Sequence, residues 1–335
     1  MSGTATTIAG PAYLAARTGA LLVERDDRVQ LRARGRDPVR MVQGLITNDL
    51  ANAAPERAIY AAMLTPKGRM IADLRVIPEA DGALLLDLDA GALEGALAHL
   101  RKMVPPLFAR FESPEPALRV VGVYGPNAAH ALRAVTGIDV GVDAEDRVTR
   151  GEFEGASLVV VSSRDAGVPG YDVFTPAEHA ASLAAGVERA GAVRGDRAAL
   201  DTLRVEAGRP RWGAELDAER IPLEAGLFER AISTSKGCYT GQEVIIRILH
   251  RGHVNWHLRG LLLGDASAQS GTELTTEVGG KPVARITSVT RSPALGQTIA
   301  LGYVRREIDP GAMLRLPDGA TARVVELPFR VEERA

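Results

Sequence analysis

One segment, KGCYTGQEVIIRILHRGHVNWH from Lys236 to His257, gathers residue types that could carry chemistry. It contains the only cysteine of the chain, Cys238, and three of the six histidines. Lys236 stands two residues before Cys238, and a nearby cation favours the reactive thiolate form of a cysteine. Gly237 and Gly241 allow the backbone to turn sharply or to approach a ligand closely. The segment is therefore a candidate site for a reactive thiol.

The same segment also allows other interpretations. Cys238 could be structural, because a free cysteine is usually a small buried hydrophobe. His250, His253 and His257 are spaced like metal ligands on one face of a helix. However, we expect a strand for VIIRILH, which alternates imperfectly, and we predict solvated histidines and no metal site. Arg247 then lies among apolar neighbours, where a guanidinium needs an anionic partner.

Composition excludes several classes of protein. The 335 residues exceed what one hydrophobic core usually holds, so two or three domains are expected. Forty Lys and Arg against forty-two Asp and Glu give a formal charge of −2, which argues against a nucleic-acid binder. No apolar run approaches the roughly 20 residues of a membrane helix, and no signal peptide is recognisable. With one cysteine there is no internal disulfide, so we expect a cytoplasmic protein.

Strand and helix patterns alternate over the first two thirds of the chain, and short strands follow. We expect strands over 27–35, 58–65, 69–78, 82–89, 116–124, 156–163 and 170–174, and helices over 36–49, 93–104, 125–137, 177–191 and 196–207. The helix at 36–49 has Asp37 as its predicted N-cap and Pro38 in its first turn. From Leu258 onward, strand and turn patterns predict a small closed β domain of roughly 75 residues.

The signature KGCYTGQEV, followed by RILHRG, resembles that of the YgfZ-type family of folate-binding iron–sulfur cluster assembly factors. That family shares its fold with the aminomethyltransferase, or T-protein, of the glycine cleavage system. The stretches MVQGLITNDL, RVEAGRPRWGAELDAERIPLEAGL and ARITSVTRSPALGQTIALGYVRR extend the resemblance over nearly the whole chain. The signature residues are Lys236, Gly237, Cys238, Tyr239, Thr240, Gly241, Gln242 and Glu243.

The resemblance implies an α+β fold in which two intertwined α+β subdomains form a folate-binding body, followed by a C-terminal β-barrel. We place the body at 1–235, the connecting signature segment at 236–257 and the barrel at 258–335. Glu206 matches the pterin-binding glutamate of T-proteins, and a carboxylate can accept two parallel N–H donors from the pterin. The alternative for Glu206 is a salt bridge to an arginine such as Arg204 or Arg209.

Lys236, Arg247 and Arg251 could supply positive charge for the anionic glutamate tail of folate. The catalytic aspartate of T-proteins falls at Ala96 in this sequence, and Asp89 occupies the position of a nearby asparagine. We therefore expect a tetrahydrofolate-binding protein that supports assembly or repair of iron–sulfur clusters. Its partners would be folate, the assembly machinery and client iron–sulfur enzymes. The alternatives are a folate-dependent methyl- or aminomethyltransferase with a displaced acid, and a scaffold that binds no folate.

Overall fold

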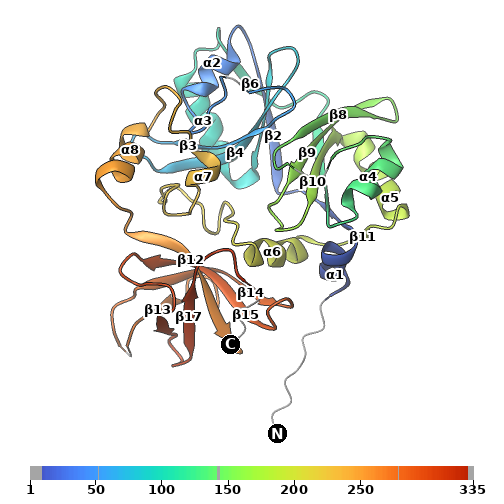
Figure 1. The fold of residues 1–335 in the computed structure, drawn as a ribbon. Helices are drawn as coiled ribbons and strands as arrows, with labels where there is room; N and C mark the ends of the chain where they lie inside the picture. Colours follow the sequence, from blue (N-terminus) through green and yellow to red (C-terminus); the bar gives the residue numbers. More distant parts are fainter. Residues whose placement is uncertain (1–9, 52, 142–143, 278, 331–335) are drawn as a thin grey trace.

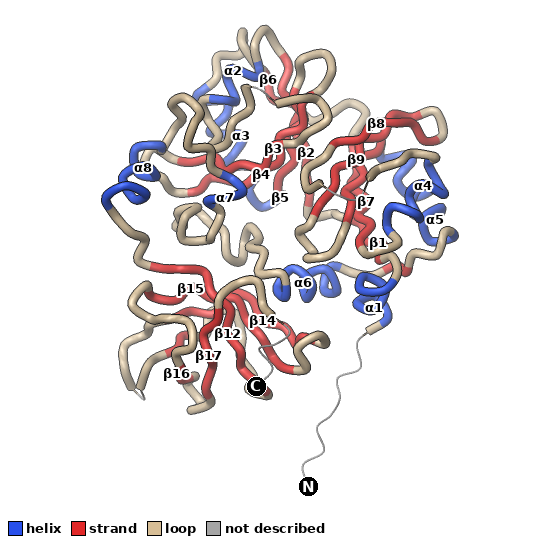
Figure 2. The backbone as a smooth tube through the Cα atoms, in the orientation of Figure 1, coloured by secondary structure: helices blue, strands red, loops and turns tan. Residues whose placement is uncertain are grey.

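The structure is a computed structural model that describes residues 10–51, 53–141, 144–277 and 279–330. Three β-sheets form separate layers of strands, with helices packed around them (Figure 1). Figure 2 shows helix α6 lying between the C-terminal sheet and the two sheets that precede it. In the described part of the chain, no helix is both long and apolar enough to cross a membrane.

The first subdomain is built on an antiparallel sheet with the strand order β3-β4-β5-β2-β6. Its elements are β2 (Arg28–Arg34), α2 (Pro38–Gln43), β3 (Ile59–Leu64), β4 (Met70–Pro78), β5 (Leu84–Asp89), the 3-10 turn η1 (Ala90–Ala92), α3 (Leu93–Met103) and β6 (Arg110–Glu112). The side chain of Asp37 accepts a hydrogen bond from the amide of Arg40, which confirms the predicted N-cap of α2. Helix α3 buries Ala96 and Leu100 in the core.

The second subdomain has the strand order β11-β1-β7-β10-β9-β8. Its elements are α1 (Pro11–Thr18), β1 (Leu21–Glu24), β7 (Leu118–Tyr124), α4 (Ala128–Thr136), β8 (Val148–Phe153), β9 (Ala156–Ser163), β10 (Gly170–Pro176), α5 (Ala177–Arg189) and β11 (Val193–Arg194). Strand β1 precedes the whole first sheet in the chain, yet pairs with β7 and β11 of the second. The two subdomains are therefore interleaved, as the resemblance implied.

The C-terminal sheet has the order β13-β14-β15-β12-β17-β16. Its strands are β12 (Trp256–Gly264), β13 (Glu273–Leu274), β14 (Ala284–Ser292), β15 (Gln297–Arg305), β16 (Met313–Arg315) and β17 (Thr321–Val325). Thr275 and Arg315 exchange backbone hydrogen bonds of 3.1 and 2.7 Å, which join the two ends of the sheet. The sheet is thus nearly closed, and the predicted C-terminal β-barrel is confirmed.

Helix α6 (Arg197–Glu206) connects the second subdomain to the barrel. Asp196 caps its N-terminus by accepting a hydrogen bond from the amide of Ala199. Leu203 is fully buried in the core that α1 and the second sheet share, whereas Val205 packs against barrel residues. Because opposite faces of one short helix are buried in two different cores, α6 fixes the barrel against the body.

Two helices follow α6: α7 (Phe228–Ala231) and α8 (Gln242–Arg251). The prediction of a strand for VIIRILH was wrong, because these residues form most of α8. Gly241 begins this helix with φ at +84°, and a side chain there would approach the carbonyl oxygen of Thr65 at 2.6 Å. Ile245 is fully buried, and Val244 packs against the turn at Gly68. The helical period leaves Arg247 and Arg251 exposed to solvent.

Candidate functional site

A central cavity lies where the two interleaved subdomains meet α6 and the loop that follows it. Its lining is strongly charged and also offers flat apolar surfaces. The charged residues are Arg25, Arg28, Arg75, Arg197, Arg204, Arg209, Arg211, Arg230, Asp27, Asp73, Asp89, Asp165, Asp172 and Asp201. The remainder of the lining is Tyr60, Tyr124, Leu200, Pro210 and Trp212. Such a cavity is the default candidate for a small-molecule site.

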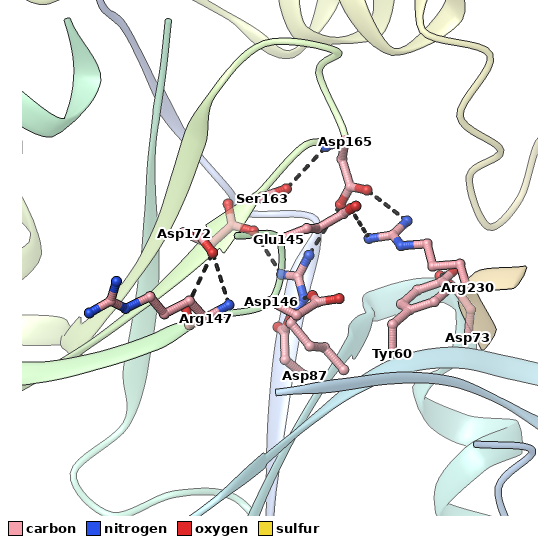
Figure 3. A network of polar contacts seen from close by, with 12 residues as sticks. Tyr60, Asp73, Asp87, Glu145, Asp146, Arg147, Ser163, Asp165, Asp172 and Arg230 are labelled. Carbon is pink, nitrogen blue, oxygen red and sulfur yellow. Dashed lines mark hydrogen bonds and ion pairs between the residues drawn. The ribbon is translucent and has the colours of Figure 1, made fainter. Parts of the chain in front are cut away.

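Arg75 of β4 organises the floor of this cavity. Its guanidinium contacts the carboxylates of Asp146 at 3.1 Å, Asp165 at 3.3 Å and Asp172 at 2.9 Å. Asp172 on β10 also accepts a hydrogen bond of 2.6 Å from the hydroxyl of Tyr124. Figure 3 shows Asp146, Asp165 and Asp172 gathered between the two sheets. The three carboxylates compensate the charge of the buried arginine. Because they come from the second subdomain and Arg75 from the first, the network fixes the two subdomains to each other.

Arg230 of α7 closes the network from the other side. Its guanidinium contacts Asp165 at 2.9 Å and Glu145 at 3.0 Å, and it lies 4.0 Å from the ring centroid of Tyr60. Burial opposes ionisation of Asp165, but Arg230 and Arg75 outweigh it and hold the pKa of this carboxyl well below its usual range. Asp165 is therefore an anion at neutral pH and is a structural partner of the two arginines.

Asp73 differs from the other carboxylates of the cavity. Its side chain comes from β4, two residues before Arg75 and on the same face of the strand. The residue is 8% exposed. Oδ2 accepts a hydrogen bond of 3.0 Å from the hydroxyl of Tyr60, while Oδ1 accepts none from another described residue. Burial raises the pKa of Asp73, and the nearby Arg28 opposes this rise.

Glu206 lies on α6, but it lines a second cavity and not the central one. Its carboxylate accepts hydrogen bonds from the hydroxyl of Tyr13 at 2.9 and 3.0 Å, from the hydroxyl of Ser292 at 2.5 Å and from the guanidinium of Arg17. The ion-pair partner is thus Arg17 of α1, whereas Arg204 pairs with Asp201 and Glu215. The predicted role of Glu206 in pterin binding stays a prediction.

Lys236 is 8% exposed and points into the first subdomain. Its ammonium donates hydrogen bonds to the backbone carbonyls of Gln43 at 2.6 Å, Ile46 at 2.7 Å and Asn48 at 2.9 Å. Burial lowers the pKa of Lys236 to about 8. Because an ammonium has three N–H donors, these three carbonyls satisfy it completely. Lys236 therefore anchors the signature segment to the loop after α2.

Cys238, Arg247 and Arg251 lie together at the surface, in an open depression beside α8. Gln242, Glu243, Ile246 and His250 complete its lining. Cys238 is exposed, and Gly237 beside it is open to solvent. Tyr239 is instead buried in the core, where burial raises the pKa of its hydroxyl to about 12, and Thr240 donates a backbone hydrogen bond to Gly44.

The structure therefore separates the predicted site residues into three places: the second cavity, the anchor of the signature segment and the surface beside α8. The three histidines are likewise distributed over the end of α8, the following loop and β12. Over the residues that the structure describes, no group of three metal-ligating side chains is present.

The sequence interpretation missed the charged floor of the central cavity. A signal was available, because Asp73 and Arg75 interrupt the apolar strand MIADLRVIP at positions that share one face. Buried charges at such positions require partners or a function. The partners of Arg75 come from β10 and from loops more than 70 residues away in the chain, which local patterns do not identify. Asp73 instead accepts a hydrogen bond from Tyr60 on the neighbouring strand β3.

Comparisons with known proteins support one family over most of the chain. Residues 5–236 match the GCVT N-terminal domain, and residues 257–330 match the glycine cleavage T-protein C-terminal barrel domain. An aminomethyltransferase of Moorella thermoacetica is 32% identical over 90% of this chain and 83% of its own length. One from Rubrobacter xylanophilus is 30% identical over 96% and 86%. The crystal structure of glycine cleavage system aminomethyltransferase T from Bartonella henselae superposes with a TM-score of 0.85, at 20% identity, over 96% of this chain and 90% of that one.

These comparisons contradict the main functional expectation from the sequence. We expected a factor for iron–sulfur cluster assembly, but the similar proteins are named aminomethyltransferases and match along most of the chain. The resemblance to the T-protein superfamily is confirmed, and its narrower assignment to the assembly factors is not supported. The expected partnership with iron–sulfur machinery has no support in these findings.

Proposed function

Because the chain belongs to the glycine cleavage T-protein family, we propose that it is a folate-dependent aminomethyltransferase that uses tetrahydrofolate. The central cavity is the proposed folate site. We also propose a cytoplasmic location. The proposed division of the chain is a body at 1–235, a connecting segment at 236–257 and a barrel from 258.

The observation that supports this proposal best is the match between the cavity lining and the chemistry of tetrahydrofolate. Eight arginines outnumber six aspartates in the lining, so it carries a formal excess of two positive charges. Tetrahydrofolate carries two carboxylates on its glutamate tail, and its ring and benzoyl group are flat. Tyr60 and Trp212 offer aromatic surfaces for such groups.

The exposure of the arginines suggests the orientation of the ligand. The side chains of Arg197, Arg209 and Arg211 are 45%, 30% and 33% exposed, whereas that of Arg75 is 5% exposed. Guanidinium groups bind carboxylates through paired hydrogen bonds, and those near solvent require the least desolvation. We therefore place the glutamate tail at the arginines of the mouth and the pterin ring toward the floor.

The acid of the reaction cannot come from the position that the resemblance suggested. Residue 96 is an alanine, and it is 1% exposed within the core of the first subdomain. Carboxylates of other elements line the cavity instead. We therefore propose that the acid of the reaction comes from a position other than residue 96. Cys238 remains a predicted reactive thiol at the surface, separate from the folate site.

A ligand titration tests the proposal. A ligand that binds the folded state alone at 100 times its Kd adds about 2.7 kcal/mol of stability. We expect tetrahydrofolate, under anaerobic conditions, to raise the Tm of the parent protein. Leu200→Trp, which fills the cavity, should abolish the rise. Leu249→Trp adds the same bulk on the exposed face of α8 and should keep it. No rise in the parent, or an equal rise in Leu200→Trp, would contradict the proposed site.

A further inference from the structure

A third cavity, which we call the junction cavity, lies where the first subdomain, the loop after α6 and the barrel meet. It shares no lining residue with the central cavity, the second cavity or the depression beside α8. The residues that define it are Arg69 before β4, Arg220 and Glu224 of the loop, and Trp256, Arg285 and Tyr303 of the barrel strands. The proposed folate site therefore gives this cavity no role.

Arg220 is held in place in the junction cavity by both its backbone and its side chain. Its guanidinium lies over the ring of Tyr303, with Cζ 3.8 Å from the ring centroid. Tyr303 is itself buried, and its hydroxyl donates a hydrogen bond of 2.7 Å to the backbone carbonyl of Glu215. The carbonyl of Arg220 accepts a hydrogen bond of 2.9 Å from the amide of Met70. A planar guanidinium stacked in this way directs its N–H donors along its own edge, where they can reach an acceptor.

The donors of Arg220 lack a matching acceptor. Nε is buried and has no hydrogen-bond partner among the residues that the structure describes. In the same part of the chain no ion pair joins Arg220 to a carboxylate, whereas Arg75 and Arg230 each pair with at least two. Burial of an unpaired N–H donor is unfavourable, so its presence here indicates an acceptor that arrives from outside the chain.

Arg69 brings a second guanidinium to the junction cavity. It is exposed and, over the described ranges, forms no ion pair either. Glu224 lies between the reach of both arginines: burial raises its pKa, while the amide of Ile221 and the charges of Arg220 and Arg69 oppose the rise. Oε2 of Glu224 accepts its hydrogen bond from that amide, at 3.2 Å, and not from an arginine. The two guanidinium groups therefore act on one small region without being neutralised there.

The remaining charges of the lining are arranged differently. Glu273 stands directly opposite Arg285 in the register of β13 and β14, so this third arginine has a carboxylate neighbour across the strands. Glu219 is exposed to solvent. The positive charge available to a ligand thus comes from the other two arginines of the cavity.

We propose that the junction cavity is a second ligand site, in which Arg220 and Arg69 bind the oxyanion group of a small organic molecule. Carboxylates and phosphate groups share this chemistry, because both accept paired hydrogen bonds from a guanidinium. Trp256 lines the same cavity and offers an apolar surface for the rest of such a ligand. The proposal does not depend on the folate function. Because the lining comes from both the first subdomain and the barrel, a bound anion would link the two.

Fluorescence of Trp256 reports on binding in this cavity. The chain has two tryptophans, so Trp212→Phe leaves Trp256 as the only one, and this variant serves as the reference protein. Sodium phosphate and sodium acetate are titrated separately at constant pH and at an ionic strength maintained with sodium chloride. We expect a saturable change in emission with at least one of the two anions. Calorimetric titration under the same conditions provides an independent measure of the Kd.

Arg220→Met, made in the reference protein, is the informative variant. Methionine keeps an apolar contact with Tyr303 but removes the N–H donors, and hydrogen bonds between charged groups are strong enough that we expect a roughly 10- to 100-fold weaker Kd. Arg69→Met changes an exposed residue, so its Kd should be weaker by roughly three- to fivefold. It also provides the test if Arg220→Met does not fold. Arg101→Met removes an exposed charge from α3, outside the cavity, and its Kd should stay within about twofold.

The anion that binds identifies the class of ligand. A response to acetate alone indicates a carboxylate, a response to phosphate alone indicates a phosphate group, and a response to both shows that the site accepts either. Saturable binding that Arg220→Met weakens and Arg101→Met preserves supports the site.

Three results would overturn the site. The first is a Kd that is equal in the reference protein and in Arg220→Met, or in Arg69→Met where the former does not fold. The second is an equal weakening in Arg101→Met, because the effect is then one of overall charge. The third is the absence of both an emission change and heat with either anion. None of these results bears on the folate proposal, since Leu200→Trp tests it in a cavity with no shared lining residue.

Discussion

Arg75 of β4 and Asp172 of β10 form an ion pair of 2.9 Å that joins the sheets of the two interleaved subdomains. Both side chains are only 5% exposed, so neither can exchange its partner for water. Removal of one member of a buried pair leaves an uncompensated charge and typically costs about 3–5 kcal/mol. We therefore expect Arg75→Met to lower the free energy of unfolding by about this amount in urea titrations.

The double variant Arg75→Met/Asp172→Asn provides the control for this prediction. It removes the stranded carboxylate together with the guanidinium, so it should recover part of the loss. Asp146 and Asp165 also contact Arg75, and the recovery will therefore be incomplete. A loss below about 1 kcal/mol in Arg75→Met would show that the pair does not fix the two sheets together.

We predict that Lys236 stabilises the folded protein by anchoring the signature segment to the loop after α2. Lys236→Met preserves most of the side-chain volume but removes the donors to the carbonyls of Gln43, Ile46 and Asn48. Buried acceptors without donors carry a desolvation penalty, so we expect a loss of about 2–4 kcal/mol in unfolding free energy. Lys67→Met, on an exposed turn, should change it by less than about 0.5 kcal/mol. Equal effects of the two variants would contradict the anchoring role.

Much of the architecture could be predicted from local patterns. The alternating segment DRVQLRARG predicts β2, and the Pro66–Gly68 turn separates the predicted strands β3 and β4. The spacing of Leu93, Leu97 and Leu100 predicts α3. The capping residues Asp37 and Asp196 identify where α2 and α6 begin. These features were readable because each depends on neighbours within one or two turns of the chain.

The central cavity could not be predicted in this way. Its floor depends on the pairing of Arg75 with carboxylates more than 70 residues away in the chain. The same holds in the second cavity, where Glu206 pairs with Arg17 at a separation of 189 residues. Helix α8 was misread because the apolar residues of VIIRILH fit either period over so short a segment. Ile246 and Leu249 are in fact exposed, so hydrophobicity alone gave a misleading pattern.

Because the pKa of Asp73 is raised, we expect the free energy of unfolding to depend on pH. Burial raises the pKa of its carboxyl above the ordinary 3.8, with Arg28 acting in the opposite direction. The folded state therefore binds the proton more tightly than the unfolded chain does. This contribution to the parent's unfolding free energy is greatest below 3.8 and falls as pH rises through the raised pKa.

Asp73→Asn removes this group, so its stability relative to the parent should increase as the pH rises from about 4 through the raised pKa of Asp73. Chemical denaturation of both proteins across this range measures the difference. Asp81→Asn, at a carboxylate that is 59% exposed, is the control for loss of one charge. A difference between Asp73→Asn and the parent that stays constant with pH would show that burial does not hold the proton on Asp73.

Cys238 is predicted to react in the native protein. Its side chain is exposed in the depression beside α8, so an alkylating reagent should label it without denaturant. Mass spectrometry of the intact protein would measure the label. Cys238→Ser should stay within about 0.5 kcal/mol of the parent in unfolding free energy, as expected for a surface position. A requirement for denaturant before labelling would contradict this placement of the thiol.

We propose that this chain transfers the carbon of an aminomethyl group to tetrahydrofolate, and an assay of product formation can show this transfer. The parent protein is mixed with tetrahydrofolate and a carrier protein that bears a thioether-linked aminomethyl group. We expect one equivalent each of methylenetetrahydrofolate, ammonium and free carrier thiol, with turnover abolished in Leu200→Trp and retained in Leu249→Trp. Tight binding of tetrahydrofolate without any methylenetetrahydrofolate would contradict the claim.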